Sequence, residues 1–290
     1  MAFEYGVDSM AGRLSKVAVR KPTAILTADA AEWHYSKDLD SEGLVRQFTD
    51  FVALLEAAGS EVLWFDDYPD ELADSIFTYD PSFMLTEGAV LLRPGKEKRR
   101  GEVDVHRRFY ERLGIPIIGE VDASGTIEGG DCFWVNSSTL AVGKGFRTND
   151  AGISQLRNLV AAEGIDVLQF DLPYYKGPDA CLHLMSLVSP LSSDLAIVFE
   201  PLLPDGLEGT LKDFGFDLLQ APEKEFNESH GLSLNVLATA PREVIAVEGF
   251  PETHRLMAEA GCSVSLFDGD ELCIPCEGGP TCLTRPIQRV

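Results

Sequence analysis

Five glycines recur at nearly equal intervals, and this repeat constrains the fold more than any other feature of the sequence. They are separated by 55, 50, 51 and 46 residues and stand at Gly59, Gly114, Gly164, Gly215 and Gly261. Each glycine follows an amphipathic stretch and precedes an apolar one. This pattern is typical of a helix that ends at a glycine in the left-handed conformation and is followed by a strand. The spacing predicts five units of about fifty residues.

A second apolar strand precedes the helix in the later units, at residues 88–93, 139–143, 194–199 and 243–247. Each unit is therefore expected to contain strands, a helix and a further strand. Five similar units favour a closed ring, because each unit then protects the sheet edges of its neighbours. We predict an α/β fold, a five-bladed α/β propeller that forms a single domain over residues 1–290. The alternative is an open α/β sheet in which the glycine spacing is coincidental.

The charge balance limits the classes of partner. The chain has 24 Lys and Arg against 47 Asp and Glu, which gives a net charge of −23. Such a charge repels phosphate backbones and anionic bilayers, so we expect neither nucleic acid nor a membrane as a partner. The N-terminal residues lack a basic segment followed by an apolar one, and no apolar run reaches about 18 residues, so we expect a cytoplasmic protein. The sequence does not settle the oligomeric state, and a homodimer is compatible with it.

Six cysteines are too few for a disulfide scaffold in a chain of 290 residues, and a cytoplasmic setting would keep them reduced. Cys273 and Cys276 have the spacing of a zinc-binding or redox pair. However, no second ligand pair lies at a suitable spacing, and a redox motif of this type would open a helix early in a βαβ unit. We therefore expect no metal site here.

Cys282 is the candidate nucleophile. It closes the stretch 278–282, in which Gly278 and Gly279 would allow a substrate to approach closely. A thiolate is an effective nucleophile when a nearby histidine assists it, and His183 is the best candidate. His183 lies in an apolar, strand-like run over residues 180–188, although a core histidine with a satisfied partner has the same pattern. The other histidines are expected at the surface: His34, His106, His230 and His254.

Two acidic stretches are candidates for binding a cation. Asp74 and Asp80 flank a short apolar segment that we interpret as a strand, and their equal parity would place them on one face. A planar guanidinium between them would supply the paired N–H groups that carboxylates accept. The alternative is a pair of turn residues. Glu128 and Asp131 enclose two glycines just before an apolar stretch, where an ordinary turn is again the alternative.

Taken together, six ordered motifs resemble the guanidino-group modifying enzymes of the pentein superfamily, and within it the dimethylarginine dimethylaminohydrolases. The resemblance extends from about residue 16 to residue 286. The motifs lie at residues 74–80, 92–95 with 99–102, 128–131, 147–149, 182–184 and 278–282.

This resemblance implies a five-bladed propeller, a small guanidino compound as substrate and no cofactor or metal. It implies that Cys282 attacks the guanidinium carbon, that His183 is the general acid and then the base, and that Glu128 orients His183. Asp80, with Asp74 and Asp131, would contact the substrate. Arg99 and Arg147 would bind the amino-acid carboxylate of the substrate or lie beside it, although ordinary surface ion pairs are the alternative for both.

The residue two positions after His183 bears on the choice of substrate. Arginine deiminases and amidinotransferases of this superfamily typically carry an acid there, which binds unsubstituted guanidino nitrogens, whereas this chain has Met185. The resemblance therefore implies hydrolysis of an N-methylated arginine to citrulline. An arginine deiminase, an amidinotransferase or a non-catalytic guanidine-binding protein are the alternatives. Dimethylarginine hydrolases tend to have lysine at this position, so Met185 departs from both patterns. Residues 28–39 are a candidate for a lid over the site.

Overall fold

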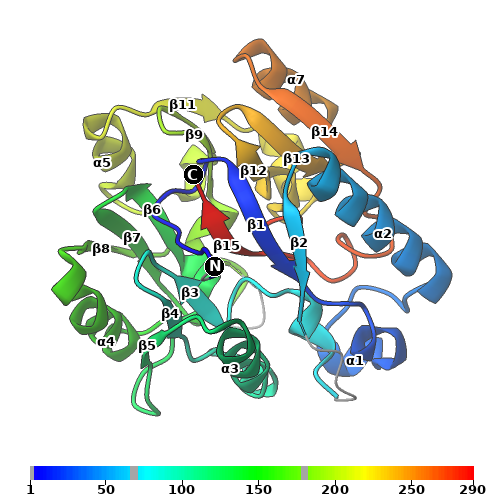
Figure 1. Ribbon diagram of the computed structural model, residues 1–290. Coiled ribbons are helices and arrows are strands. Elements are labelled where there is room, and N and C mark those ends of the chain that lie inside the picture. The colour runs from blue at the N-terminus through cyan, green and yellow to red at the C-terminus, as the bar shows by residue number, and fades with distance from the viewer. Residues whose placement is uncertain (1–2, 66–70, 178–181) are drawn as a thin grey trace.

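The computed structural model describes residues 3–65, 71–177 and 182–290. In this part of the chain, five three-stranded sheets surround a central axis, and the longer helices lie outside them (Figure 1). The predicted five-bladed α/β propeller is therefore confirmed, and the open sheet is excluded. The structure describes no helix long and apolar enough to cross a bilayer within these residues.

The five sheets share one topology. In each sheet the middle strand pairs antiparallel with one neighbour and parallel with the other. The sheets are β15 (Arg285–Arg289), β1 (Leu14–Val19) and β2 (Glu61–Trp64); β3 (Ser82–Met84), β4 (Ala89–Leu91) and β5 (Ile117–Glu120); β6 (Cys132–Asn136), β7 (Thr139–Lys144) and β8 (Asp166–Asp171); β9 (Val188–Ser192), β10 (Leu195–Val198) and β11 (Asp217–Gln220); and β12 (Leu237–Ala240), β13 (Glu243–Val247) and β14 (Ser263–Phe267).

A helix precedes the parallel strand of every sheet. These helices are α2 (Ser41–Ala57), α3 (Glu102–Leu113), α4 (Asp150–Val160), α5 (Leu207–Asp213) and α7 (Pro251–Glu259), and two short helices, α1 (Ala30–Trp33) and α6 (Glu223–Glu228), lie in connections. All five repeat glycines have positive φ, between 69° and 90°. Each glycine therefore takes the left-handed conformation predicted for it, and a β-carbon there would be strained.

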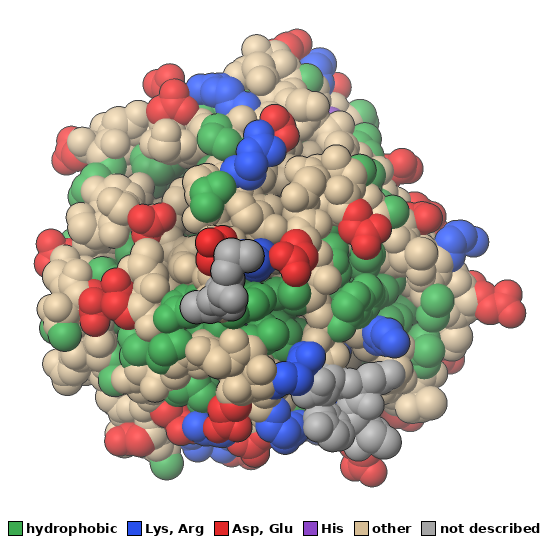
Figure 2. Space-filling view, viewed as in Figure 1, with side chains coloured by type: hydrophobic (Ala, Val, Ile, Leu, Met, Phe, Trp, Pro, Cys, Tyr) green, Lys and Arg blue, Asp and Glu red, His purple; other side chains and the backbone are tan. Residues whose placement is uncertain are grey.

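The ring closes through the two ends of the chain. The last strand, β15, pairs antiparallel with β1, so the C-terminal residues complete the first sheet. Both strands lie near the centre of the ring in Figure 1. This pairing brings the turn that precedes β15, and with it Cys282, to the axis. Figure 2 shows the face that is viewed in Figure 1, with acidic side chains at its rim and also near its centre.

Three local expectations were wrong. Residues 74–80 are not a strand, because Ala73–Ile76 form a 3-10 helix and the strand begins only at Ser82. His183 does not lie within a strand either: it caps a 3-10 helix over Leu184–Ser186, and residues 180 and 181 of the predicted run lie outside the described residues. His106 is buried rather than exposed, because it lies on the inner face of α3 and bonds to Ser82 at 2.8 Å.

Candidate active site

One cavity of about 380 Å³ lies on the axis and receives side chains from all five sheets or their connections. It brings together most of the residues that the sequence singled out. The predicted residues that line it are Cys282, His183, Asp80, Asp74, Arg99 and Arg147, and Met185 is also in its wall. His34 and His230, which are exposed as expected, lie at this cavity as well.

The principal polar residues occupy equivalent places in successive units. Asp80, Glu128, His183, Asn235 and Cys282 each stand a few residues before the first strand of a blade, which is β3, β6, β9, β12 and β15 respectively. Because these strands begin near the axis, the residues before them converge there. Asn235 was not among the residues predicted for the site, although it lies 52 residues after His183 and 47 before Cys282, which matches the repeat of about fifty residues.

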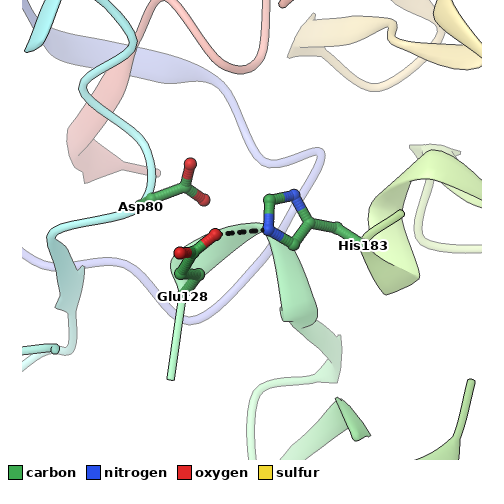
Figure 3. A group of neighbouring side chains, drawn as sticks. All are labelled: Asp80, Glu128 and His183. Carbon is green, nitrogen blue, oxygen red and sulfur yellow. Dashed lines mark hydrogen bonds and ion pairs between the residues drawn. The ribbon is translucent and has the colours of Figure 1, made fainter. Parts of the chain in front are cut away.

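His183 and Glu128 form a buried pair. Nε2 of His183 lies 2.7 Å from Oε2 of Glu128, and neither residue exceeds 7% exposure. Figure 3 marks this contact with a dashed line. The other carboxylate oxygen of Glu128 accepts hydrogen bonds from the backbone N–H groups of Gly95 at 2.9 Å and Lys96 at 3.2 Å. Burial would raise the pKa of Glu128, but the hydrogen bond and charge of His183, with nearby arginines, hold that pKa well below its ordinary value. Glu128 is therefore a fixed anion that orients the imidazole.

The glycines beside Glu128 serve close packing. A β-carbon on Gly130 would lie 2.6 Å from Nδ1 of His183, which leaves no room for any other residue. The backbone N–H of Gly130 also donates to Oδ1 of Asp80 at 2.8 Å. Gly130 therefore lets the chain pass between His183 and the carboxylate of Asp80, and Gly129 lets it pass close to the backbone of Tyr79.

Cys282 is held by Asn235. The side-chain amide of Asn235 donates to Sγ of Cys282 at 3.0 Å, and its oxygen accepts from the backbone N–H of Thr281 at 3.0 Å. A β-carbon on Gly279 would lie 2.5 Å from Cγ of Asn235. The glycine that was expected to make room for a substrate therefore makes room for this amide, which fixes the sulfur.

Arg99 is part of a buried ion-pair network rather than a surface pair. Its guanidinium contacts Asp80 through Nη1 and bonds Glu102 through Nε at 3.0 Å and Nη2 at 2.9 Å. Nη2 also donates to the carbonyl of Phe77 at 2.8 Å. Burial raises the pKa of Glu102 to about 7 despite the opposing charge of Arg99. Because these bonds occupy most of its donors, Arg99 positions Asp80.

Asp74 joins the 28–39 segment to the cavity wall. Its Oδ1 accepts from the hydroxyl of Tyr35 at 2.8 Å, and its Oδ2 pairs with Nζ of Lys96 at 2.6 Å. Nζ of Lys96 also lies 5.2 Å from the ring centroid of Trp33. Trp33 and Tyr35 line the cavity, so the segment expected to cover the site does border it.

Arg147 and Asp131 occupy different places around Glu128. Nη1 of Arg147 lies 3.5 Å from Oε1 of Glu128, and the side chain lines the cavity. Asp131 is fully buried and is not among the described residues that line the cavity. Its oxygens accept from Oγ1 of Thr148 at 2.6 Å and from the backbone N–H of Leu184 at 2.9 Å. Asp131 therefore fixes the backbone next to His183, and this contact differs from the substrate contact expected for it.

Asp131 makes stability depend on pH. Burial raises its pKa to about 6, so the folded protein binds this proton more tightly than the unfolded chain. A raised carboxyl pKa contributes stability that is complete below about pH 4 and is lost as the pH rises through about 6. We expect the wild type to lose roughly 1 kcal/mol of unfolding free energy through this group between pH 5 and pH 7.

The variant D131N lacks this titration. The difference in unfolding free energy between wild type and D131N should therefore shrink by roughly 1 kcal/mol from pH 5 to pH 7. Urea unfolding at both pH values measures it, with D205N as a control because Asp205 is exposed. An equal difference at the two pH values would contradict the shift.

Among the described residues, one group has a geometry that could hold a metal ion. It consists of the carboxylates of Asp80 and Glu128 and the imidazole of His183, whose ligand atoms lie within 4.8 Å of one another. The carboxylate oxygens of Asp80 and Glu128 already interact with Gly130, Arg99, Gly95, Lys96 and His183. A metal ion would have to break these interactions. Burial also raises the pKa of the thiols of Cys273 and Cys276, which opposes the thiolate form that binds zinc.

Known proteins resemble this chain along nearly its whole length. A family model described as arginine deiminase matches residues 65–208. A Streptomyces coelicolor protein named N(G),N(G)-dimethylarginine dimethylaminohydrolase is 30% identical over 276 residues, which cover 95% of this chain and 98% of that protein. A Pseudomonas aeruginosa protein of the same name is 25% identical over 270 residues, with 92% and 97% covered.

Solved structures agree with the fold. The dimethylarginine dimethylaminohydrolase of Pseudomonas aeruginosa, in complex with citrulline, superposes with a TM-score of 0.75 at 22% identity and covers 96% of this chain and 100% of that one. The N-terminal domain of a cyanobacterial arginine dihydrolase, bound to its substrate, gives a TM-score of 0.79 at 18% identity, with 94% and 98% covered.

Proposed function

The chain belongs to the dimethylarginine dimethylaminohydrolase family of the pentein superfamily and is a hydrolase of amidine C–N bonds, and we propose that its substrate is an N-methylated arginine. The observation that supports this most directly is the meeting of Cys282 and His183 at one cavity that is bordered by Asp74 and Asp80. A thiol, an imidazole and carboxylates around a space for a small molecule are the groups that guanidinium hydrolysis requires.

The proposed first half-reaction uses Cys282 and His183. The Cys282 thiolate forms a C–S bond to the guanidinium carbon and produces a tetrahedral adduct. The adduct collapses when the C–N bond to the methylated nitrogen breaks, and the departing amine takes a proton from His183. Glu128 holds the imidazole of His183 through Nε2, so the ring keeps one orientation while it exchanges this proton. The product of this stage is an alkylthiouronium on Cys282.

In the second half-reaction water replaces the thiolate. His183, now neutral, accepts a proton from a water molecule that attacks the thiouronium carbon. The C–S bond then breaks as the hydroxyl group of the adduct gives its proton to solvent and becomes the ureido carbonyl, Cys282 returns to the thiolate, and citrulline leaves. Glu128 stabilises the protonated imidazole at each stage and keeps its ring oriented. The hydrogen bond from Asn235 holds the sulfur in one place throughout.

The remaining cavity residues bind the substrate in this proposal. Asp80 and Asp74 accept N–H groups of the guanidinium, and each carboxylate oxygen has a second lone pair beyond the bond it already accepts. Arg147, which borders the cavity, pairs with the amino-acid carboxylate. Arg99 acts indirectly, because its bonds to Asp80 and Glu102 fix the position of Asp80.

Met185 supports a substituted guanidinium as substrate. Its side chain is 7% exposed and lies in the cavity wall, so an unsubstituted guanidino nitrogen there would lose its hydrogen bonds to water and gain none. N-methyl groups would instead contact the thioether favourably. This argument ranks a methylated arginine above free arginine.

Introducing an acid at this position should reverse the preference. We expect M185D to raise the ratio of kcat/KM for arginine to kcat/KM for dimethylarginine at least about tenfold, because a carboxylate accepts N–H donors but not methyl groups. Steady-state citrulline assays with both substrates measure the ratio. M185L is the matched control, since it preserves the apolar wall and should leave the ratio near that of the wild type. An unchanged ratio in M185D would show that residue 185 does not contact the reacting nitrogens.

A substrate panel tests the proposed function itself. The wild-type protein is incubated with asymmetric dimethylarginine, monomethylarginine, arginine and agmatine, and ureido products are quantified by mass. We expect the methylated arginines to give the highest kcat/KM. A new guanidine formed only when glycine, lysine or ornithine is added would instead identify an amidinotransferase. Tight calorimetric binding without any product would identify a binding protein.

A further inference from the structure

A second, much smaller cavity lies next to the active site. Its volume is about 10 Å³, so it has room for one small particle at most. It shares Tyr79, Met185 and Thr281 with the wall of the active-site cavity. Its other lining residues include Trp134, Arg285 and Arg289.

Two hydrogen-bond donors in this lining have no partner among the described residues. They are Nε of Arg285 and Nε1 of Trp134, and both atoms are buried. Both side chains contact the same ring: the guanidinium carbon of Arg285 lies 6.0 Å from the centroid of Phe83, and the Trp134 ring lies 5.7 Å from it. Neither nitrogen can accept a hydrogen bond, so only an acceptor can satisfy the pair.

The same cavity has two buried cations without a carboxylate. Arg285 is 2% exposed and Arg289 is 7% exposed. Among the described residues, neither arginine forms an ion pair with a carboxylate. Arg285 bonds the backbone carbonyls of Tyr79 and Ser82 and also interacts with the side chain of Tyr79, and Arg289 bonds the backbone carbonyl of Gly12. Burial and the charge of Arg285 lower the pKa of Arg289 to about 10. Buried charges are normally paired, so two adjacent guanidinium groups favour an anion between or beside them.

We propose that this cavity binds one monovalent anion of the size of chloride, which accepts hydrogen bonds from Nε of Arg285 and Nε1 of Trp134 and offsets the charge of Arg289. The small volume excludes polyatomic anions. Because the cavity shares a wall with the active site, the anion also reduces the positive potential at the place where the proposed function requires a guanidinium cation to bind. The anion site itself rests on the arginines and the tryptophan alone, and not on the proposed function.

Thermal unfolding of the whole protein tests the site. Sodium chloride replaces sodium gluconate at constant ionic strength, since gluconate is monovalent but too large for the cavity. We expect the unfolding midpoint to rise by roughly 5 °C as chloride reaches about 100 times its Kd, with a saturable dependence. Identical midpoints in chloride and gluconate would overturn the proposal and would show that water fills the cavity.

A conservative variant locates the effect. W134F keeps an aromatic ring against Phe83 but removes the N–H donor, so the chloride concentration at half-saturation should rise about tenfold. W64F is the matched control, because Trp64 lies on β2 and does not line this cavity. An unchanged half-saturation in W134F would contradict binding at this site.

Crystals of the wild type grown in sodium bromide provide a measurement that does not depend on how well a variant folds. Bromide replaces chloride in such sites and scatters anomalously. An anomalous peak within hydrogen-bond distance of Nε of Arg285 and Nε1 of Trp134 is the expected result. Density there without anomalous signal would assign the cavity to water and overturn the proposal.

Discussion

Replacing Cys282 by serine is expected to lower kcat for dimethylarginine by about 10⁴-fold or more. Serine has nearly the same size and can keep the hydrogen bond from Asn235, so the cavity should retain its shape. The hydroxyl, however, stays protonated near neutral pH and is a far weaker nucleophile than a thiolate. KM should change little, because the carboxylates at the cavity remain in place. Steady-state citrulline assays measure both constants.

The same experiment separates Cys282 from the other thiols. C262S is the control, because Cys262 is buried beside the start of β14 and is not in the cavity lining; its kcat should match that of the wild type. Acid-quenched samples are also examined by peptide mass. Wild type should carry the amidino adduct on Cys282, whereas C282S should carry none. Citrulline formation by C282S at the wild-type rate would exclude Cys282 as the nucleophile.

The repeat could be predicted because it depends on local chemistry. A helix end that takes the left-handed conformation selects glycine wherever it occurs, so the five units are visible at Gly59 and its four equivalents without any knowledge of how the units pack. The prediction that Asp74 and Asp80 flank a strand was wrong, because the parity argument assumes extended backbone and residues 73–76 form a 3-10 helix instead. Both acids nevertheless border the cavity.

Contacts between units were beyond prediction for a physical reason. The bonds of Glu128 to the backbone of Gly95 and Lys96, and that of Asp74 to Tyr35, join segments whose relative positions are set only when the ring closes. Asn235 is a different case. It stands shortly before β12, as His183 stands shortly before β9, so the repeat indicates its approximate position. An isolated asparagine in a polar loop, however, has no chemical signature of its own.

The variant E128Q tests whether the buried acid acts through His183. We expect kcat to fall by about 10³-fold, because the neutral amide no longer stabilises the protonated imidazole or enforces its orientation. In the wild type, the interaction with His183 keeps the pKa of Glu128 well below its ordinary value. By reciprocity, the charge of Glu128 favours protonation of the imidazole. Without that charge, the loss of kcat on the alkaline side should begin at lower pH. A pH profile of kcat measures both effects.

A loss of stability alone would not shift the pH profile of kcat. The variant E225Q is a control for this point. Glu225 is also a buried acid that accepts several bonds, from the backbone of Glu252 at 2.9 Å and from Thr253 at 2.8 Å and 2.6 Å, but it does not line the cavity. E225Q and E128Q should each lower the unfolding free energy by about 1–3 kcal/mol, since each leaves buried donors without a full partner. Only E128Q should move the pH profile. If both variants keep the wild-type profile, Glu128 serves packing alone, and another group must orient His183.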